Sequence, residues 1–177
     1  MKKTPNDILA DLVKPALDVI ICGTAAGPTS ALTENPYSHA SNKFYTIMYE
    51  AGFTPEIITP ENHQMLLDYG VGLTDLAKKA YGTDNQLKLG DYDVNRLHSL
   101  LINSHPRFLG FNGKKSAKIF LDREWVDYGI QMEKVGTTKI VVLPSTSWKA
   151  SVVWSQSYWF QLAELINNKN NKKELIQ

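Results

Sequence analysis

The sequence predicts a three-layer α/β/α sandwich with a mostly parallel central sheet, formed by one domain over residues 1–177. The first observation is a continuous β-branched run at residues 19–22, which is typical of a strand covered on both faces. The second is that apolar runs at residues 108–111 and 139–143 alternate with segments of helical spacing, as in α/β layer folds. No repeat or internal boundary interrupts this pattern, so a single core is expected.

The segments between these runs are expected to form helices and turns. An N-terminal helix is predicted within residues 1–16, and a polar tail over residues 168–177 ends the chain. Residues 129–135 and 139–143 flank a glycine turn and predict a hairpin. Helical spacing or capping signals predict the other helices from residue 41 to 52, from residue 59, and at 74–82, 94–102, 114–121 and 155–167.

Composition excludes several classes of protein. Apolar residues make up 43% of the chain and charged residues 21%, and the net charge of +1 gives no overall attraction to nucleic acid, so any basic surface must be local. The single cysteine, Cys22, lies inside a predicted strand, which argues against disulfides and thiolate metal clusters and favours a cytoplasmic location, nucleoid-associated in a bacterium. We expect no signal peptide, membrane span or metal site.

Two segments follow strands at what should be the same edge of the sheet. Residues 23–27 (GTAAG) have side chains small enough for backbone N–H groups to approach a ligand, and residues 144–149 (PSTSWK) carry hydroxyl groups. Ligands bind at the carboxyl ends of the strands in an open α/β sheet. The two segments are therefore either tight turns or two sides of one ligand site.

Residues 35–42 add three polar side chains close to the first of these segments. Tyr37 either stacks on a planar ligand, a contact worth about 1–3 kcal/mol for a nucleic-acid base, or seals its loop against the core. His39 and Asn42 are candidates for orienting a water molecule, and Asn42 is equally suited to capping the helix that follows.

Gly113, Lys114 and Lys115 open a helix directly after a strand. Backbone N–H groups at a helix start and two ammonium groups would suit a phosphate, although a solvated helix start has the same composition. The segment does not have the spacing of a P-loop.

In order and spacing, these segments resemble the uracil-DNA glycosylase superfamily and, within it, the mismatch-specific uracil/thymine branch. Residues 23–27 are similar to G-I-N-P-G of that branch, and Tyr37 stands where a stacking aromatic follows the Asn position by twelve residues. The similarity covers roughly residues 17–166. Its other matching segments are HASNKFY at 39–45, AGFT at 51–54, DYGVGLTDL at 68–76, FNGK at 111–114 and LPSTSWK at 143–149.

The resemblance implies an enzyme that flips a base out of duplex DNA and hydrolyses its N-glycosidic bond without a metal or other cofactor. The implied partner is double-stranded DNA carrying uracil, thymine in a G mismatch or hypoxanthine, bound by a monomer. The implied base-binding residues are Gly23, Thr24, Ala25, Ala26, Tyr37 and Ser145. The implied DNA contacts are Lys43, Lys114, Lys115, Thr146, Ser147, Trp148 and Lys149, with Trp148 or Lys149 filling the gap in the duplex unless Trp148 packs inward.

Two departures from the family pattern concern catalysis. The Asn that holds the attacking water falls on Ala25, and a methyl group cannot orient water. Leu143 stands near the His with which the strongest uracil-removing branch stabilises the leaving base, a loss shared with the mismatch branch. The hypoxanthine-removing branch also lacks the first-motif Asn, so by analogy Asn42 and His39 are the expected catalytic residues.

Three functions are therefore open. The first is a base-excision repair glycosylase, and the second is a catalytically weak relative that binds lesions or mismatches without cutting the bond. The third is a small-molecule nucleobase- or nucleotide-binding α/β enzyme that uses residues 23–27. A wedge at Trp148 and Lys149 argues against the third, since a small ligand needs no wedge.

Overall fold

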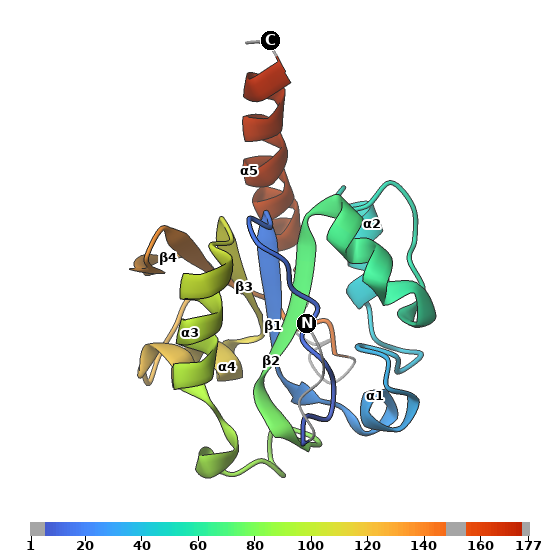
Figure 1. Ribbon diagram of the computed structural model, residues 1–177, viewed down its shortest axis with the longest axis vertical. Helices are drawn as coiled ribbons and strands as arrows, with labels where there is room; N and C mark the ends of the chain where they lie inside the picture. Colours follow the sequence, from blue (N-terminus) through green and yellow to red (C-terminus); the bar gives the residue numbers. More distant parts are fainter. Residues whose placement is uncertain (1–5, 148–154, 175–177) are drawn as a thin grey trace.

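The computed structural model describes residues 6–147 and 155–174, and the fold is a mostly parallel sheet between helices (Figure 1). The five strands lie in the order β2-β1-β3-β5-β4, with all neighbours parallel except the antiparallel edge strand β4. This confirms the predicted fold class. The strand bounds are β1 Val19–Ala26, β2 Val71–Tyr81, β3 Phe108–Asn112, β4 Gly129–Val135 and β5 Thr138–Leu143.

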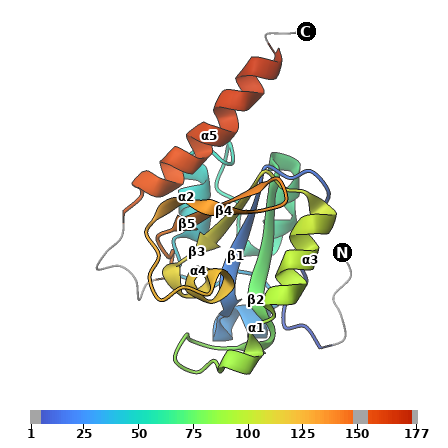
Figure 2. The same cartoon turned by 90° about the vertical axis from the view of Figure 1, so that its left-hand side faces the viewer.

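Helices cover both faces of the sheet (Figures 1 and 2). On one face α2 and α5 pack around the buried Phe44 and Trp159, and on the other α3 and α4 pack around Leu97 and Phe120. The alternation of β1 divides its side chains between these two cores, because successive strand residues point to opposite faces. The helices are α1 Pro28–Thr33, α2 Phe44–Glu50, α3 Val94–Ser104, α4 Lys114–Leu121 and α5 Ser157–Glu174, with 3-10 helices η1 Pro60–Tyr69 and η2 Leu89–Asp91.

The predicted N-terminal helix is wrong in the described residues, because residues 6–18 contain no helix. This segment runs along the outer side of β2 and forms one antiparallel bridge, between Leu12 and Leu73. Leu9 and Val13 are still buried, 7% exposed each. Tertiary contacts with the edge of the sheet therefore decide its conformation rather than its helical spacing.

The predicted helix at residues 74–82 is also wrong, since these residues belong to β2. The strand is buried on both faces over most of its length, with Leu73 in one core and Leu76 in the other. A strand buried on both faces loses the alternation that would distinguish it from a helix. Pairing with β1 from Val19 to Ala26 supplies the backbone hydrogen bonds that a helix would have made internally.

The first strand is longer than predicted. Residues 23–26 continue β1 beyond Cys22 instead of forming a loop, and Pro28 begins α1, which the sequence pattern did not predict. The predicted helices at 94–102 and 114–121 and the hairpin of β4 and β5 are confirmed. No helix in the described ranges is long and apolar enough to cross a membrane.

Candidate functional site

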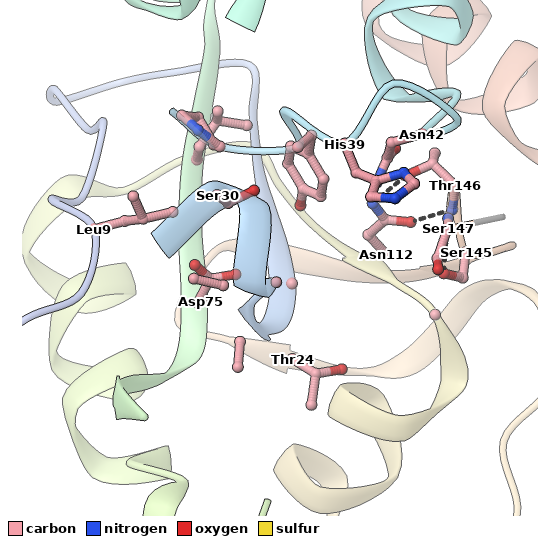
Figure 3. A pocket seen from close by; sticks show the side chains of 18 of the residues that line it. Leu9, Thr24, Ser30, His39, Asn42, Asp75, Asn112, Ser145, Thr146 and Ser147 are labelled. Carbon is pink, nitrogen blue, oxygen red and sulfur yellow. Dashed lines mark hydrogen bonds between the residues drawn. The ribbon is translucent and has the colours of Figure 1, made fainter. Parts of the chain in front are cut away.

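A cleft of about 610 Å³ opens where β1, β2 and β3 end (Figure 3). The end of β1 forms its floor, α1 and the loop to His39 and Asn42 form one side, and residues 112–115 with 145–147 form another. The two segments predicted to lie at one edge of the sheet therefore do converge on one cavity. Its volume is within the range of small-molecule and base-sized sites.

The first segment provides a floor with little side-chain bulk. Gly23, Thr24, Ala25 and Ala26 all line the cleft, as does Gly27 beyond them. A Cβ atom built on Gly23 would overlap an oxygen of the Asp75 side chain and come within 3.4 Å of the Tyr37 hydroxyl. Glycine is therefore required at this position because two polar side chains of the cleft meet the backbone there.

Tyr37 is held firmly from the side opposite the cleft. Its ring stacks on Phe44, with the centroids 4.0 Å apart and the planes at 18°, and its backbone has a left-handed φ of 55°. The Tyr45 hydroxyl donates to the Pro36 carbonyl at 2.8 Å and so fixes the same loop. Stacking of Tyr37 on a base stays a prediction, but the structure gives the ring a fixed position beside the cavity.

The hydroxyl of Tyr37 is buried and has no hydrogen-bond partner of normal geometry within the described residues. Burial and then the nearby Asp75 raise the pKa of this phenol, and the Asn112 side chain opposes them in part. The phenol therefore keeps its proton at neutral pH and presents a hydrogen-bond donor without a partner.

His39 and Asn42, the predicted catalytic residues, both line the cleft. The Asn42 Oδ1 atom accepts from the backbone N–H of Phe44 at 3.0 Å, as expected for an asparagine at a helix start. The His39 Nδ1 atom lies 2.8 Å from the Ser41 hydroxyl. Their roles in holding water stay predictions, and each has one polar atom already engaged by a local contact.

The second segment is clasped to the end of β3. The Asn112 amide donates to the Thr146 hydroxyl and accepts from the Thr146 backbone N–H, both at 2.9 Å. The backbone N–H of Lys43 donates to the Thr146 carbonyl at 3.0 Å. Thr146 is 1% exposed, so its side chain holds the loop while Ser145 and Ser147 carry its other cleft-lining hydroxyls.

The other predicted DNA contacts are distributed differently. Lys114 and Lys115 line the cleft at the start of α4, and the Lys114 ammonium lies 4.5 Å from the centre of the Tyr128 ring. Lys43 instead borders a separate shallow depression beside α2. Trp148 and Lys149 lie outside the described residues, so the predicted wedge has no structural account here. None of these DNA contacts is tested by the structure.

Asp75 is a cleft residue that the sequence pattern missed, because residues 74–82 were taken as a surface helix. It lies on β2 directly opposite Gly23 in the sheet. Within the described residues its carboxylate oxygens make no hydrogen bond, although most buried polar groups in proteins are paired. In Figure 3 it lies apart from the group formed by Asn42, Asn112 and Ser145. The signal in the sequence was one carboxylate within the apolar run VGLTDLA.

The surroundings of Asp75 alter its acidity. Burial raises the pKa of its carboxyl from 3.8 to about 6. Lys78 and Arg96 act in the opposite direction, and Asp11 acts in the same direction as burial. Carboxyl groups poised near neutral pH are concentrated at functional sites, although structural networks also produce them.

A charged network supports this side of the cleft. Asp11, on the N-terminal segment, lies 2.9 Å from the Lys78 ammonium and 2.8 Å from the Arg96 guanidinium. The Thr74 hydroxyl donates to the same carboxylate at 2.6 Å, and Arg96 also donates to the Asp75 backbone carbonyl at 2.6 Å. The network ties the N-terminal segment and α3 to β2, which holds Asp75 in place.

Comparisons with known proteins agree with this architecture. The family model described as the uracil DNA glycosylase superfamily matches residues 10–168. Among solved structures, one similar chain is the solution NMR structure of a candidate uracil DNA glycosylase from Methanosarcina acetivorans. That chain is 16% identical with a TM-score of 0.65, and the match covers 90% of this chain and 96% of the other. At this identity the structural likeness speaks for the fold.

Proposed function

Because the chain belongs to the uracil DNA glycosylase superfamily, we propose that it removes a deaminated or mismatched base from duplex DNA by hydrolysing the N-glycosidic bond. Uracil, thymine opposite guanine and hypoxanthine are the proposed substrates, and the mismatch-specific branch is the proposed relationship within the superfamily. Monomeric binding to double-stranded DNA without a metal or cofactor is part of the same proposal.

One observation carries this proposal: three separated sequence segments that resemble family motifs line the same cleft. Gly23 at the end of β1, Tyr37 in the following loop and Ser145 after β5 all contribute to it. An enzyme that acts on a base within a duplex must extrude it into such a pocket, because the reacting bond is inaccessible inside the stack.

The polar groups of the cleft suit a base that leaves with negative charge. Backbone N–H groups of residues 23–26 and the Ser145 hydroxyl are the proposed donors to its oxygens. Fixed donors lower the barrier more than they strengthen substrate binding, because the charge on the base develops only in the transition state. Lys114 and Lys115 are the proposed phosphate contacts, which would position the duplex without reading its sequence.

The attacking water needs a polar group that Ala25 does not supply. Asn42 and His39 stay the proposed holders, since both line the cleft, and the unengaged polar atoms of their side chains are available to water. Ala25 also supports a second candidate function, a relative that binds lesions or mismatches without cleaving the bond. The two candidates differ in chemistry and share the same cleft.

The test uses labelled duplexes carrying G·U, G·T, inosine or ethenocytosine. Each is incubated with excess protein and then treated with alkali, which breaks the strand at abasic sites. We expect strand breaks at one or more lesions and none in the undamaged duplex. Lesion-selective binding without breaks would overturn the glycosylase proposal and support the binding-only candidate. If breaks form, Asn42→Ala should abolish them, and unchanged activity would reject Asn42 as the water-holding residue.

A further inference from the structure

We propose that Asp75 reads the hydrogen-bonding edge of the extruded base, and that it does so as a carboxylic acid. The inference rests on the proposed function, because it assigns a role to a residue in the same cleft. It adds a specificity residue on β2, a strand from which the sequence pattern assigned no site residue.

The depth of Asp75 in the cleft places it at the far edge of a bound base. Asp75 is opposite Gly23, two residues before Ala25 in the direction of β1, and the mouth lies beyond the carboxyl ends of the strands. With a rise of about 3.3 Å per residue, this level is roughly 7 Å below Ala25. The sugar of a flipped nucleotide stays with the DNA backbone at the mouth, so the opposite edge of its base enters first.

The local packing leaves the carboxyl group available to a ligand. The absence of a side chain on Gly23 gives the Asp75 oxygen its space, and the Tyr37 hydroxyl lies next to the same point. The buried hydroxyl of Tyr37 has no partner, and the Asp75 carboxyl has none among the described residues. Two polar groups that lack partners and face the same part of a cavity are expected to be satisfied by what binds there.

A protonated carboxyl group matches the edges of deaminated bases. Its O–H donates and its C=O accepts side by side, as required by O4 and N3–H of uracil or O6 and N1–H of hypoxanthine. An ionised carboxylate only accepts and would face the base carbonyl with like charge. The acid also fits the edge of cytosine, so rejection of normally paired cytosine falls to the cost of extruding it, which is smaller for a mispaired base.

The surroundings of Asp75 favour the protonated form when the cleft is filled. Burial already raises the pKa of its carboxyl to about 6, and a base that excludes further water acts in the same direction. The charged or titratable groups around it are Tyr37 from the loop, Cys22 on β1, Lys78 on β2, Asp11 on the N-terminal segment and Arg96 on α3. Asp11 satisfies much of the charge of Lys78 and Arg96, since it lies within 3 Å of both.

The test measures binding and excision separately. Binding uses a duplex with 2′-fluoro-2′-deoxyuridine opposite guanine, whose glycosidic bond resists hydrolysis, and is expressed as the ratio of its Kd to that of the undamaged duplex. The wild-type preference for the lesion should fall by about tenfold per pH unit above about pH 6, as for loss of one proton. Asp75→Asn keeps a donor beside an acceptor without ionising, so its preference should stay high across the same range.

Asp68→Asn is the matched control, because it makes the same change of charge at an exposed position outside the cleft. It should follow the wild-type pH profile. Gly23→Ala provides a second test without a change of charge, since its methyl group would displace the Asp75 oxygen. This variant should lose lesion preference while binding undamaged DNA as the wild type does.

Three results would overturn the inference. If Asp75→Asn retains the wild-type pH profile, Asp75 does not read the base. If it binds the lesion normally but excises uracil at no pH, Asp75 holds the water instead. If the wild type neither prefers the lesion duplex nor excises uracil, the proposed function itself fails. A wild type that prefers the lesion without cleaving it leaves the reading role intact and rejects only the glycosylase reaction.

Discussion

The two walls of the cleft hold their polar groups in opposite ways. On the β5 side, Asn112 and Thr146 satisfy each other through two hydrogen bonds. On the β2 side, a satisfied network around Asp11 lies next to Asp75, whose carboxyl has no hydrogen bond among the described residues. The comparison separates groups that build the site from a group placed to meet a ligand, because an unpaired polar group lowers stability unless something binds it.

The largest expected effect comes from breaking the network on the β2 wall. Asp11→Ala would leave the Lys78 ammonium, whose side chain is 3% exposed, without its anionic partner. Removing one member of a buried ion pair typically destabilises a protein by about 3–5 kcal/mol. Urea unfolding should show a loss of this order. A loss close to zero would mean that the network contributes nothing to holding β2 and the N-terminal segment together.

The unpaired carboxyl on the same wall should behave in the opposite way. The pKa of Asp75 is about 6 in the folded protein and 3.8 ordinarily, so between these values the folded state retains a proton that the unfolded chain releases. Stability therefore falls as the pH rises through this window and stays reduced above it, by at most about 3 kcal/mol. Asp75→Asn should remove this loss.

Unfolding curves of wild type and Asp75→Asn at about pH 4 and pH 7 check this prediction. The variant should gain stability at the higher pH and differ little at the lower one. Equal stability at both values would show that Asp75 ionises without penalty, and the contrast between the two walls would then be lost.

The clasp on the β5 wall should give a smaller loss than the Asp11 network. Asn112→Ala leaves the buried Thr146 N–H without its acceptor, and unsatisfied groups of this kind reduce stability by about 1–3 kcal/mol. Thr146→Val removes only the bond between the side chains and serves as the milder comparison. Thermal unfolding should rank Asn112→Ala below Thr146→Val, and the reverse order would contradict a role of Asn112 in fixing the loop backbone.

The smallest effect on folding is expected at the mouth of the cleft. Replacing Lys114 and Lys115 with Ala should leave stability nearly unchanged, because both begin a helix at the surface. If both contact phosphates, DNA affinity should weaken on all sequences alike, and the slope of log K against log salt should decrease in magnitude by roughly 0.9 per lysine. Fluorescence anisotropy over a salt series measures this slope, and an unchanged slope would exclude both contacts.

The sequence predicted the sheet, its last hairpin and the convergence of two segments on one cleft. These features depend on local pattern and on the general rule that strands end at a common edge. The error at residues 74–82 was more consequential, because a strand buried on both faces resembles a helix in its apolar spacing. With that strand went Asp75, whose significance comes from its pairing with Gly23 and from burial, neither of which is local in sequence.

The site residues named from the family resemblance divide along the same line. Tyr37, Asn42 and Ser145 reach the cleft as their motif positions imply. The engagement of Thr146 by Asn112 could not be predicted, because it depends on how the ends of β3 and β5 lie side by side. Resemblance thus located the segments, and packing determined which side chains remain available to a ligand.

The central claim is that this cleft hydrolyses the bond between a damaged base and its sugar despite Ala25. The most direct measurement is the mass-spectrometric detection of free base released from a G·U or inosine-containing duplex under single-turnover conditions with excess protein. We predict release of uracil or hypoxanthine in amounts equal to the alkali-labile sites formed in the strand. A duplex that is bound tightly but returned intact, with no free base, would contradict the claim.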